Sequence, residues 1–208
     1  SSDLAQEEAE LAESGMVMWR NRSYDHVPVT VGNISGNFNG MDDLTHVSYF
    51  NSHDEQRLGY HLITEGRSNE AYDIKNPLIT FERQKLAAAF TFLYPGPKMM
   101  WQFDELGYDI DINFNGRTGQ KPQPWGADGL GYYGDPLRQY IYDVYKGVLD
   151  VRKKVGPGKM DEAATNHKLS GEARRLSYDT DSIDLMVVGN YGLENAVIEA
   201  TFSETGDW

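Results

Sequence analysis

The 208-residue chain carries a formal net charge of −13, from 32 acidic and 19 basic residues. This charge disfavours nucleic acid as a partner, because its phosphates would be repelled. Hydrophobic residues make up 39% of the chain and aromatic residues 12%, which allows a sizeable core in one or two domains and argues against wholesale disorder. Cysteine is absent, so disulfides, thiol nucleophiles and thiolate metal ligands are excluded. No apolar run has the length that a membrane span needs.

The first part of the chain predicts short strands joined by long loops. Residues 3–13 predict a short helix, because their apolar positions share one broad face. Residues 16–19 predict a buried strand. Residues 20–44 are rich in Asn, Gly and Asp and predict a long loop, which in a compact domain is usually functional or mobile. Residues 46–50 predict a second strand, and residues 61–76 predict another irregular region.

Two amphipathic helices are the clearest elements of the sequence. Residues 78–93 keep their apolar side chains on one face, and Pro95 follows to end the helix. Residues 136–153 show the same pattern, with Asp135 as the predicted N-cap. An apolar run at residues 99–101 lies between the helices and predicts a third strand.

The order of these elements indicates how the chain divides. Strands that alternate with helices are expected to be parallel, with right-handed crossovers. After a polar linker at residues 157–170, three short β-type runs separated by turns predict an antiparallel meander; they are residues 174–178, 183–188 and 196–201. We therefore predict an α/β domain over residues 1–156 and the start of an antiparallel β domain over residues 157–208.

Polar residues directly follow two of the predicted strands. His53, Asp54 and Arg57 come after the strand at residues 46–50, and Asp104 comes after the run at residues 99–101. A parallel α/β enzyme presents its functional side chains at this carboxyl edge of the sheet. The alternative interpretation is a strand followed by an ordinary solvated turn.

The two stretches contain Ser-His-Asp-Glu at residues 52–55, Pro-Gly-Pro at residues 95–97 and Trp-Gln-Phe at residues 101–103. Together they resemble the last strands of the catalytic barrel in the alpha-amylase family of glycoside hydrolases, and the Ser-His-Asp-Glu form resembles a bacterial branch of it. The resemblance runs from about residue 13 to the end of the chain. It implies the C-terminal part of a (β/α)8 TIM barrel, about strands 6 to 8, followed by a truncated antiparallel β-sandwich domain.

The resemblance also implies roles for individual residues. Retaining glycosidases use a carboxylate nucleophile and a carboxylic acid/base around an oxocarbenium-like transition state. Asp54 takes the place of a third carboxylate that supports this transition state, and His53 takes the place of a residue that binds sugar hydroxyls. Arg57 is expected to pair with Asp54 or another carboxylate, and Asp104 to help shape the sugar site. For Asp104 and its neighbour Glu105, capping a turn or forming a salt bridge is an equal alternative.

Two catalytic carboxylates of the family have no counterpart here. The family's nucleophile lies in a Gly-x-Arg-x-Asp strand end, which the sequence does not contain. The acid/base Glu is expected upstream of Ser1. The chain alone is therefore not expected to hydrolyse starch, and the N-terminal part of the same barrel is an expected partner.

The implied function is cleavage of α-glucosidic bonds in starch-like α-glucans. The closest alternatives are an α-glucosidase or transglycosylase of the same family, because they share the His-Asp motif. An alternative of another class is a non-catalytic homologue that binds α-glucan. A secreted or periplasmic location would fit a polysaccharide-degrading parent, although the sequence leaves the compartment open.

No cofactor is expected for this chain. Residues 111–116 look like the start of a calcium loop, but Pro122 stands where such a loop needs a bidentate Glu. The five His residues show no metal spacing. We therefore predict no metal site here and leave calcium as an option for the parent protein.

Overall fold

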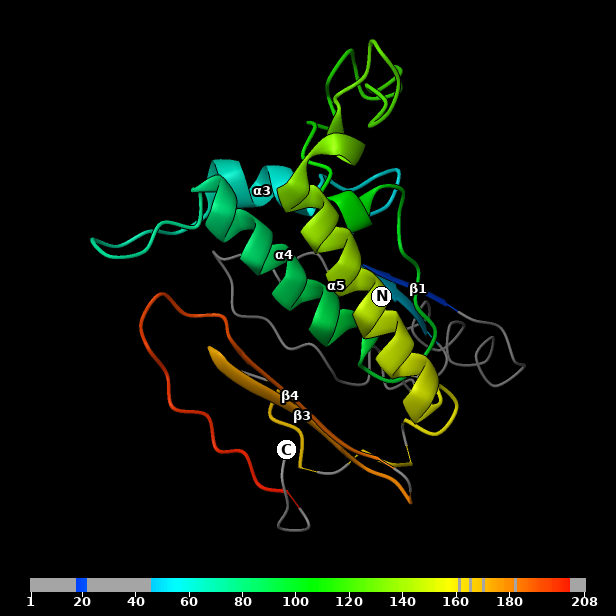
Figure 1. Ribbon diagram of the computed structural model, residues 1–208, viewed down its shortest axis with the longest axis vertical. Coiled ribbons are helices and arrows are strands. Elements are labelled where there is room, and N and C mark those ends of the chain that lie inside the picture. The colour runs from blue at the N-terminus through cyan, green and yellow to red at the C-terminus, as the bar shows by residue number, and fades with distance from the viewer. Residues whose placement is uncertain are drawn as a thin grey trace, which may run out of the picture.

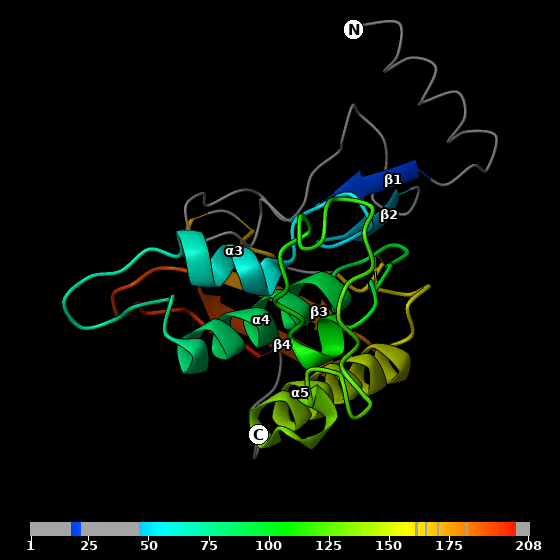
Figure 2. The same ribbon diagram turned by 90° about the horizontal axis from the view of Figure 1, so that it is seen from above.

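A computed structural model describes residues 18–21, 46–160, 162–164, 166–169, 171–181 and 183–202. The predicted helix at residues 3–13 and most of the predicted loop at residues 20–44 lie outside these ranges. Figure 1 shows three helices beside two small sheets, and Figure 2 shows the same elements from above.

The first sheet is parallel, as predicted. Strand β1 (Met18–Asn21) pairs with strand β2 (His46–Tyr49), with Met18 opposite His46. Ser48 also forms an isolated parallel bridge with Lys98 on its other side. The backbone bonds there are Ser48 N–H to the Pro97 carbonyl at 3.0 Å and Met99 N–H to the Ser48 carbonyl at 3.1 Å. Three segments therefore run side by side in the order β1, β2, Lys98.

The prediction of a strand at residues 99–101 is wrong in extent. Pairing is confined to the bridge at Lys98, and residues 99–101 are not in a strand. The chain turns away because Trp101 N–H donates to the Asp104 carboxylate at 3.1 Å, and Asp104 N–H donates to the Trp101 carbonyl at 3.0 Å. The turn leads directly into the short 3-10 helix η2 (Asp104–Leu106).

The two predicted amphipathic helices are confirmed. Helix α4 (Pro77–Phe92) begins at Asn76, whose side chain accepts from Leu78 N–H at 3.0 Å. Helix α5 (Pro136–Val155) begins at Asp135, whose side chain accepts from Leu137 N–H at 2.9 Å. Each N-cap satisfies a backbone donor that has no partner within its own helix. The two helices lie side by side (Figure 1).

A third helix, α3 (Leu58–Glu65), lies partly where an irregular region was predicted. Its sequence includes Gly59 and β-branched residues, which weaken helix propensity. Burial overrides this weakness, because Leu58 and Leu62 are almost completely covered by the core. The Asn51 side chain accepts from Leu58 N–H at 2.9 Å and so fixes the start of the helix from outside it.

The second sheet is an antiparallel hairpin, as predicted. Strand β3 (Ala173–Asp179) pairs with strand β4 (Asp184–Asn190). The predicted strand at residues 196–201 is not formed; the Glu199 carbonyl instead accepts from the Arg175 guanidinium. Within the predicted linker, residues 164 and 168 form isolated bridges to β3, so this segment packs on the hairpin.

Helix α4 lies between two apolar clusters. One cluster joins α3, α4, α5 and the end of β2; its buried members include Phe50, Leu62, Phe81, Phe92, Ile141 and Tyr145. The other joins α4 and the C-terminal end of α5 to the hairpin; its buried members include Phe90, Leu93, Val155, Met160, Leu176 and Tyr178. Gly189 permits this contact, because a Cβ there would lie 2.4 Å from Leu86 Cδ1 and 2.5 Å from Phe90 Cε2.

Among the helices described, none has both the length and the apolar character that crossing a bilayer requires. The part of the fold that matters for function is where β2 runs parallel to the segment at Lys98. Both segments end on the same side, so the loops at residues 50–57 and 101–107 are neighbours.

Candidate functional site

A buried hydrogen-bond network joins the two strand-end loops. The Asn51 side-chain amide donates to Asp104 Oδ1, while Asp104 Oδ2 accepts from Trp101 N–H at 3.1 Å. Asn51 also accepts from the first residue of α3, as described above. Both side chains are almost fully buried, at 2% and 3% exposure. Asn51 therefore links β2, α3 and the turn after Lys98 through a single side chain.

Asp104 has a strongly perturbed acidity. Burial raises the pKa of its carboxyl to about 7, against the opposing effects of the hydrogen bonds from Asn51 and Trp101 and of the nearby Arg57. Glu105 adds a smaller like-charge contribution that raises the pKa further. A carboxyl of this kind changes protonation near neutral pH at the junction of the two loops.

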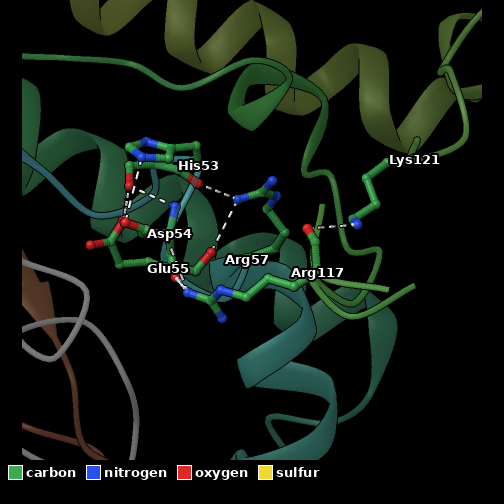
Figure 3. Close-up of polar contacts among 7 residues, drawn as sticks. His53, Asp54, Glu55, Arg57, Arg117 and Lys121 are labelled. Atoms are coloured by element: carbon green, nitrogen blue, oxygen red, sulfur yellow. Dashed lines mark hydrogen bonds and ion pairs between the residues drawn. The ribbon is translucent and has the colours of Figure 1, made fainter. Parts of the chain in front are cut away.

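Arg57 is buried and shapes the loop that precedes it. Its Nη1 donates to the Ser52 carbonyl and, at 3.1 Å, to the Glu55 carbonyl. These bonds curl residues 52–55 around the guanidinium, and His53 and Asp54 of this turn are exposed (Figure 3). In the described part of the chain Asp54 pairs with His53 and Arg117, and the predicted pair between Arg57 and Asp54 is not formed.

His53 and Asp54 form the exposed part of the site. Their side chains are 75% and 66% exposed, and His53 Nε2 lies 3.5 Å from Asp54 Oδ2. The Ser52 hydroxyl accepts from Asp54 N–H at 3.1 Å and also contacts the Glu55 carboxylate. The His53 ring lies 6.1 Å from the Trp101 ring, so the two strand ends also meet at the surface.

Arg117 is the cation that contacts Asp54, and sequence reasoning did not single it out. Its Nη2 donates to the Asp54 carbonyl at 2.6 Å and lies 3.3 Å from Asp54 Oδ1 (Figure 3). Lys121 Nζ donates to the carbonyls of Gly116, Arg117 and Gly119 at 2.7, 3.2 and 2.9 Å. The only signal in the sequence was position, because Arg117 directly follows residues 111–116, which look like the start of a calcium loop.

The four predicted site residues are thus all at one edge but in two layers. His53 and Asp54 are exposed, whereas Arg57 and Asp104 are buried and bind backbone or amide groups. Together with Arg117, the outer layer offers an imidazole, a carboxylate and a guanidinium to a ligand. The inner layer holds the loops that carry them.

The predicted start of a calcium loop is a hydrogen-bonded turn. Asp111 Oδ1 accepts from Asn113 N–H at 2.9 Å and from the Gln56 side chain at 2.8 Å. These bonds lower the pKa of Asp111. In the part of the chain that the structure describes, no three His, Asp or Glu side chains converge on a point where a metal ion would fit.

Comparison of the sequence with protein-family models and with curated proteins gave no match. The assignment of function therefore depends on the residues of the site and on the resemblance carried by the two strand-end motifs.

Proposed function

We propose that this chain is the C-terminal part of a retaining glycoside hydrolase that acts on α-glucosidic bonds of starch-like α-glucans. The observation that carries the proposal is the exposed His53–Asp54 pair at the carboxyl end of β2, beside the turn with Trp101 and Asp104 that follows the parallel bridge at Lys98. In this proposal the (β/α)8 barrel is completed by chain upstream, which also supplies the nucleophile and the acid/base.

Asp54 suits a role in transition-state stabilisation. The transition state of glycoside hydrolysis carries developing positive charge on the sugar ring. A carboxylate fixed next to that ring stabilises the charge more than it stabilises the neutral substrate, and this difference lowers the barrier. Contacts with Arg117 and with Ser52 hold the main chain of Asp54, so its carboxylate is supported on a defined turn.

His53 and Arg117 suit the binding of a neutral, hydroxyl-rich substrate. Imidazole and guanidinium groups donate hydrogen bonds, and both side chains are exposed next to the Asp54 carboxylate. The three residues together offer donors and an acceptor over a short surface. Such mixed donors and acceptors suit sugar hydroxyls, which donate and accept in equal measure.

A non-catalytic α-glucan-binding protein is the second candidate. Two observations favour it: the sequence contains no Gly-x-Arg-x-Asp strand end, and Arg117 already contacts the one carboxylate that would act. An α-glucosidase or transglycosylase differs from the main proposal only in the substrate or acceptor, and product analysis separates them.

The test is a starch assay on the complete natural protein that contains this chain. Asp54→Asn is expected to lower the release of reducing sugar by about a hundredfold or more, the scale on which removal of one electrostatic transition-state contact acts. Glu70→Gln removes an exposed carboxylate elsewhere and is the matched control. Full activity of Asp54→Asn would exclude this role for Asp54, and an inactive wild type that still binds starch would favour the non-catalytic candidate.

A further inference from the structure

Trp125 lines two pockets beside the proposed active site. One pocket, of about 370 Å³, is lined by Arg57, Phe103, Tyr108 and residues that include Gln120 and Gln123. The other, of about 390 Å³, is lined by Phe114 and by residues on both sides of Trp125, again with Gln120 and Gln123. Trp125 is therefore one of the residues that both pockets share. Each pocket is within the size range of small-ligand sites.

The aromatic side chains here are arranged as a platform and not as a closed core. Trp125 contacts Phe103 edge-to-face at 5.2 Å and Tyr133 at 6.2 Å. Trp125 is nevertheless 47% exposed, Tyr133 is 50% exposed and Phe114 is 49% exposed. Aromatic faces that are supported from one side and open on the other are typical of binding surfaces.

Polar residues line the first pocket. Arg57 is 6% exposed, yet its Nε has no hydrogen-bond partner among the described residues. Gln120 and Gln123 line both pockets, and each amide offers two donors and an acceptor. Because the Arg57 Nε is itself buried, the polar groups that a ligand can reach in these pockets are the Gln120 and Gln123 amides.

The loop that carries Trp125 is held in place before any ligand arrives. Leu130 N–H donates to the Gln123 carbonyl at 2.9 Å, and Tyr132 N–H donates to the Pro124 carbonyl at 3.0 Å. The Tyr108 hydroxyl donates to the Pro122 carbonyl at 2.6 Å. Gly129 passes so close that a Cβ there would lie 2.0 Å from the Trp125 carbonyl oxygen. A site fixed in this way spends less binding energy on ordering itself.

The same loop also contacts the turn that carries Asp54. Arg117 contacts Asp54, and Lys121 holds the carbonyl of Arg117 and lines both pockets. The segment from residue 107 to residue 131 projects beyond the ends of α3 and α5 (Figure 1). A polymer that reaches Asp54 therefore has the platform next to it.

We propose that the two pockets lined by Trp125 form a binding site for α-glucan separate from the Asp54 turn. One glucose ring stacks on the indole, and hydroxyls of this ring and its neighbour bond to the amides of Gln120 and Gln123. The choice of α-glucan rests on the function proposed above. The platform itself selects a neutral ligand with apolar faces and many hydroxyls, and the net charge of −13 disfavours an anionic one.

The experiment is a calorimetric titration of the full chain with maltoheptaose. Trp125→Ala is expected to weaken binding by about tenfold or more, as truncation of a central aromatic residue does. Trp125→Phe keeps a ring and is expected to recover part of the affinity. Gln123→Ala is expected to weaken binding by less than Trp125→Ala. Tyr140→Ala is the matched control, because Tyr140 is 56% exposed on α5 and lines neither pocket.

Circular dichroism of each variant separates lost binding from lost fold. Absence of maltoheptaose binding, unchanged affinity in Trp125→Ala, or equal affinity for cellohexaose overturns the proposal. The starch assay with Asp54→Asn gives an independent readout. Asp54-dependent hydrolysis with binding indifferent to Trp125 removes this proposal alone, whereas Trp125-dependent binding without hydrolysis removes only the proposed enzymatic function.

Discussion

The strand-end region and the β-hairpin region each contain a side chain whose pKa burial shifts, and the two pKa values move in opposite directions. In the strand ends, burial raises the pKa of Asp104 to about 7. Beside the hairpin, burial and then the nearby Arg175 lower the pKa of His167 to about 4. In both cases burial favours the neutral form.

The surroundings of the two groups differ in what they support. The His167 ring lies 6.1 Å from the Tyr94 ring and 5.0 Å from the Tyr178 ring, and its Nδ1 accepts from Ser177 N–H at 3.0 Å. These contacts join the segment before β3 to the hairpin. Asp104 instead connects two loops whose outer residues are exposed. The comparison teaches that a perturbed pKa alone does not identify a functional site; here only the strand ends combine it with exposed chemical groups.

The largest expected effect comes from the guanidinium that shapes the strand-end loop. Arg57→Met leaves the Ser52 and Glu55 carbonyls without their donor and is expected to lower the free energy of unfolding by about 3 kcal/mol. Urea unfolding measures it. Arg117→Met is the matched control: the Arg117 side chain is 54% exposed, and its loss is expected to cost about 0.5 kcal/mol or less. Equal losses would contradict the division into inner and outer layers.

The second prediction concerns the pH dependence that Asp104 gives to the strand ends. The folded state holds the proton up to about pH 7, whereas the unfolded chain releases it near the ordinary value of 3.8. Between these values the folded state binds more protons, so this contribution to stability is present at low pH and is lost as pH rises to about 7. Asp104→Asn does not titrate. The free energy of unfolding of the wild type, relative to that of this variant, is therefore expected to fall from pH 4 to pH 8. Urea unfolding at each pH measures it, and a constant difference between the two proteins would contradict the prediction.

The third prediction, with the smallest expected effect, concerns His167, which is expected to lower stability as pH falls and not as pH rises. The folded state keeps the imidazole neutral down to about pH 4, while the unfolded chain takes up a proton below about 6.5. Stability is therefore lost as pH falls from 6.5 to 4. His167→Phe removes this loss and, because Ser177 N–H loses its acceptor, is expected to cost about 1 kcal/mol at pH 8. Asp104→Asn serves as the reference, because it keeps His167 and must still lose stability as pH falls from 6.5 to 4. If His167→Phe also lost stability over this range, His167 would not be the group responsible.

The sequence alone determined the elements whose signals are local. Helices α4 and α5 were predicted from one-sided apolar faces, with Pro95 ending the first and Asp135 capping the second, and these signals depend on neighbouring residues only. Strand directions and the first hairpin followed from the order of the elements. The polar strand ends with His53 and Asp54 were also visible, because an apolar run that breaks into charged residues is a local pattern.

Other features depend on long-range contacts, which a sequence pattern does not contain. Helix α3 forms because Leu58 and Leu62 are buried and Asn51 caps it, and the run at residues 99–101 turns away because Asp104 captures Trp101 N–H. Arg117 reaches Asp54 from 63 residues away. Sequence patterns predict which residues are polar at a strand end. Whether each one is buried or exposed is set by partners that the fold brings from elsewhere, and that separates the layer that holds the loops from the layer that can bind a ligand.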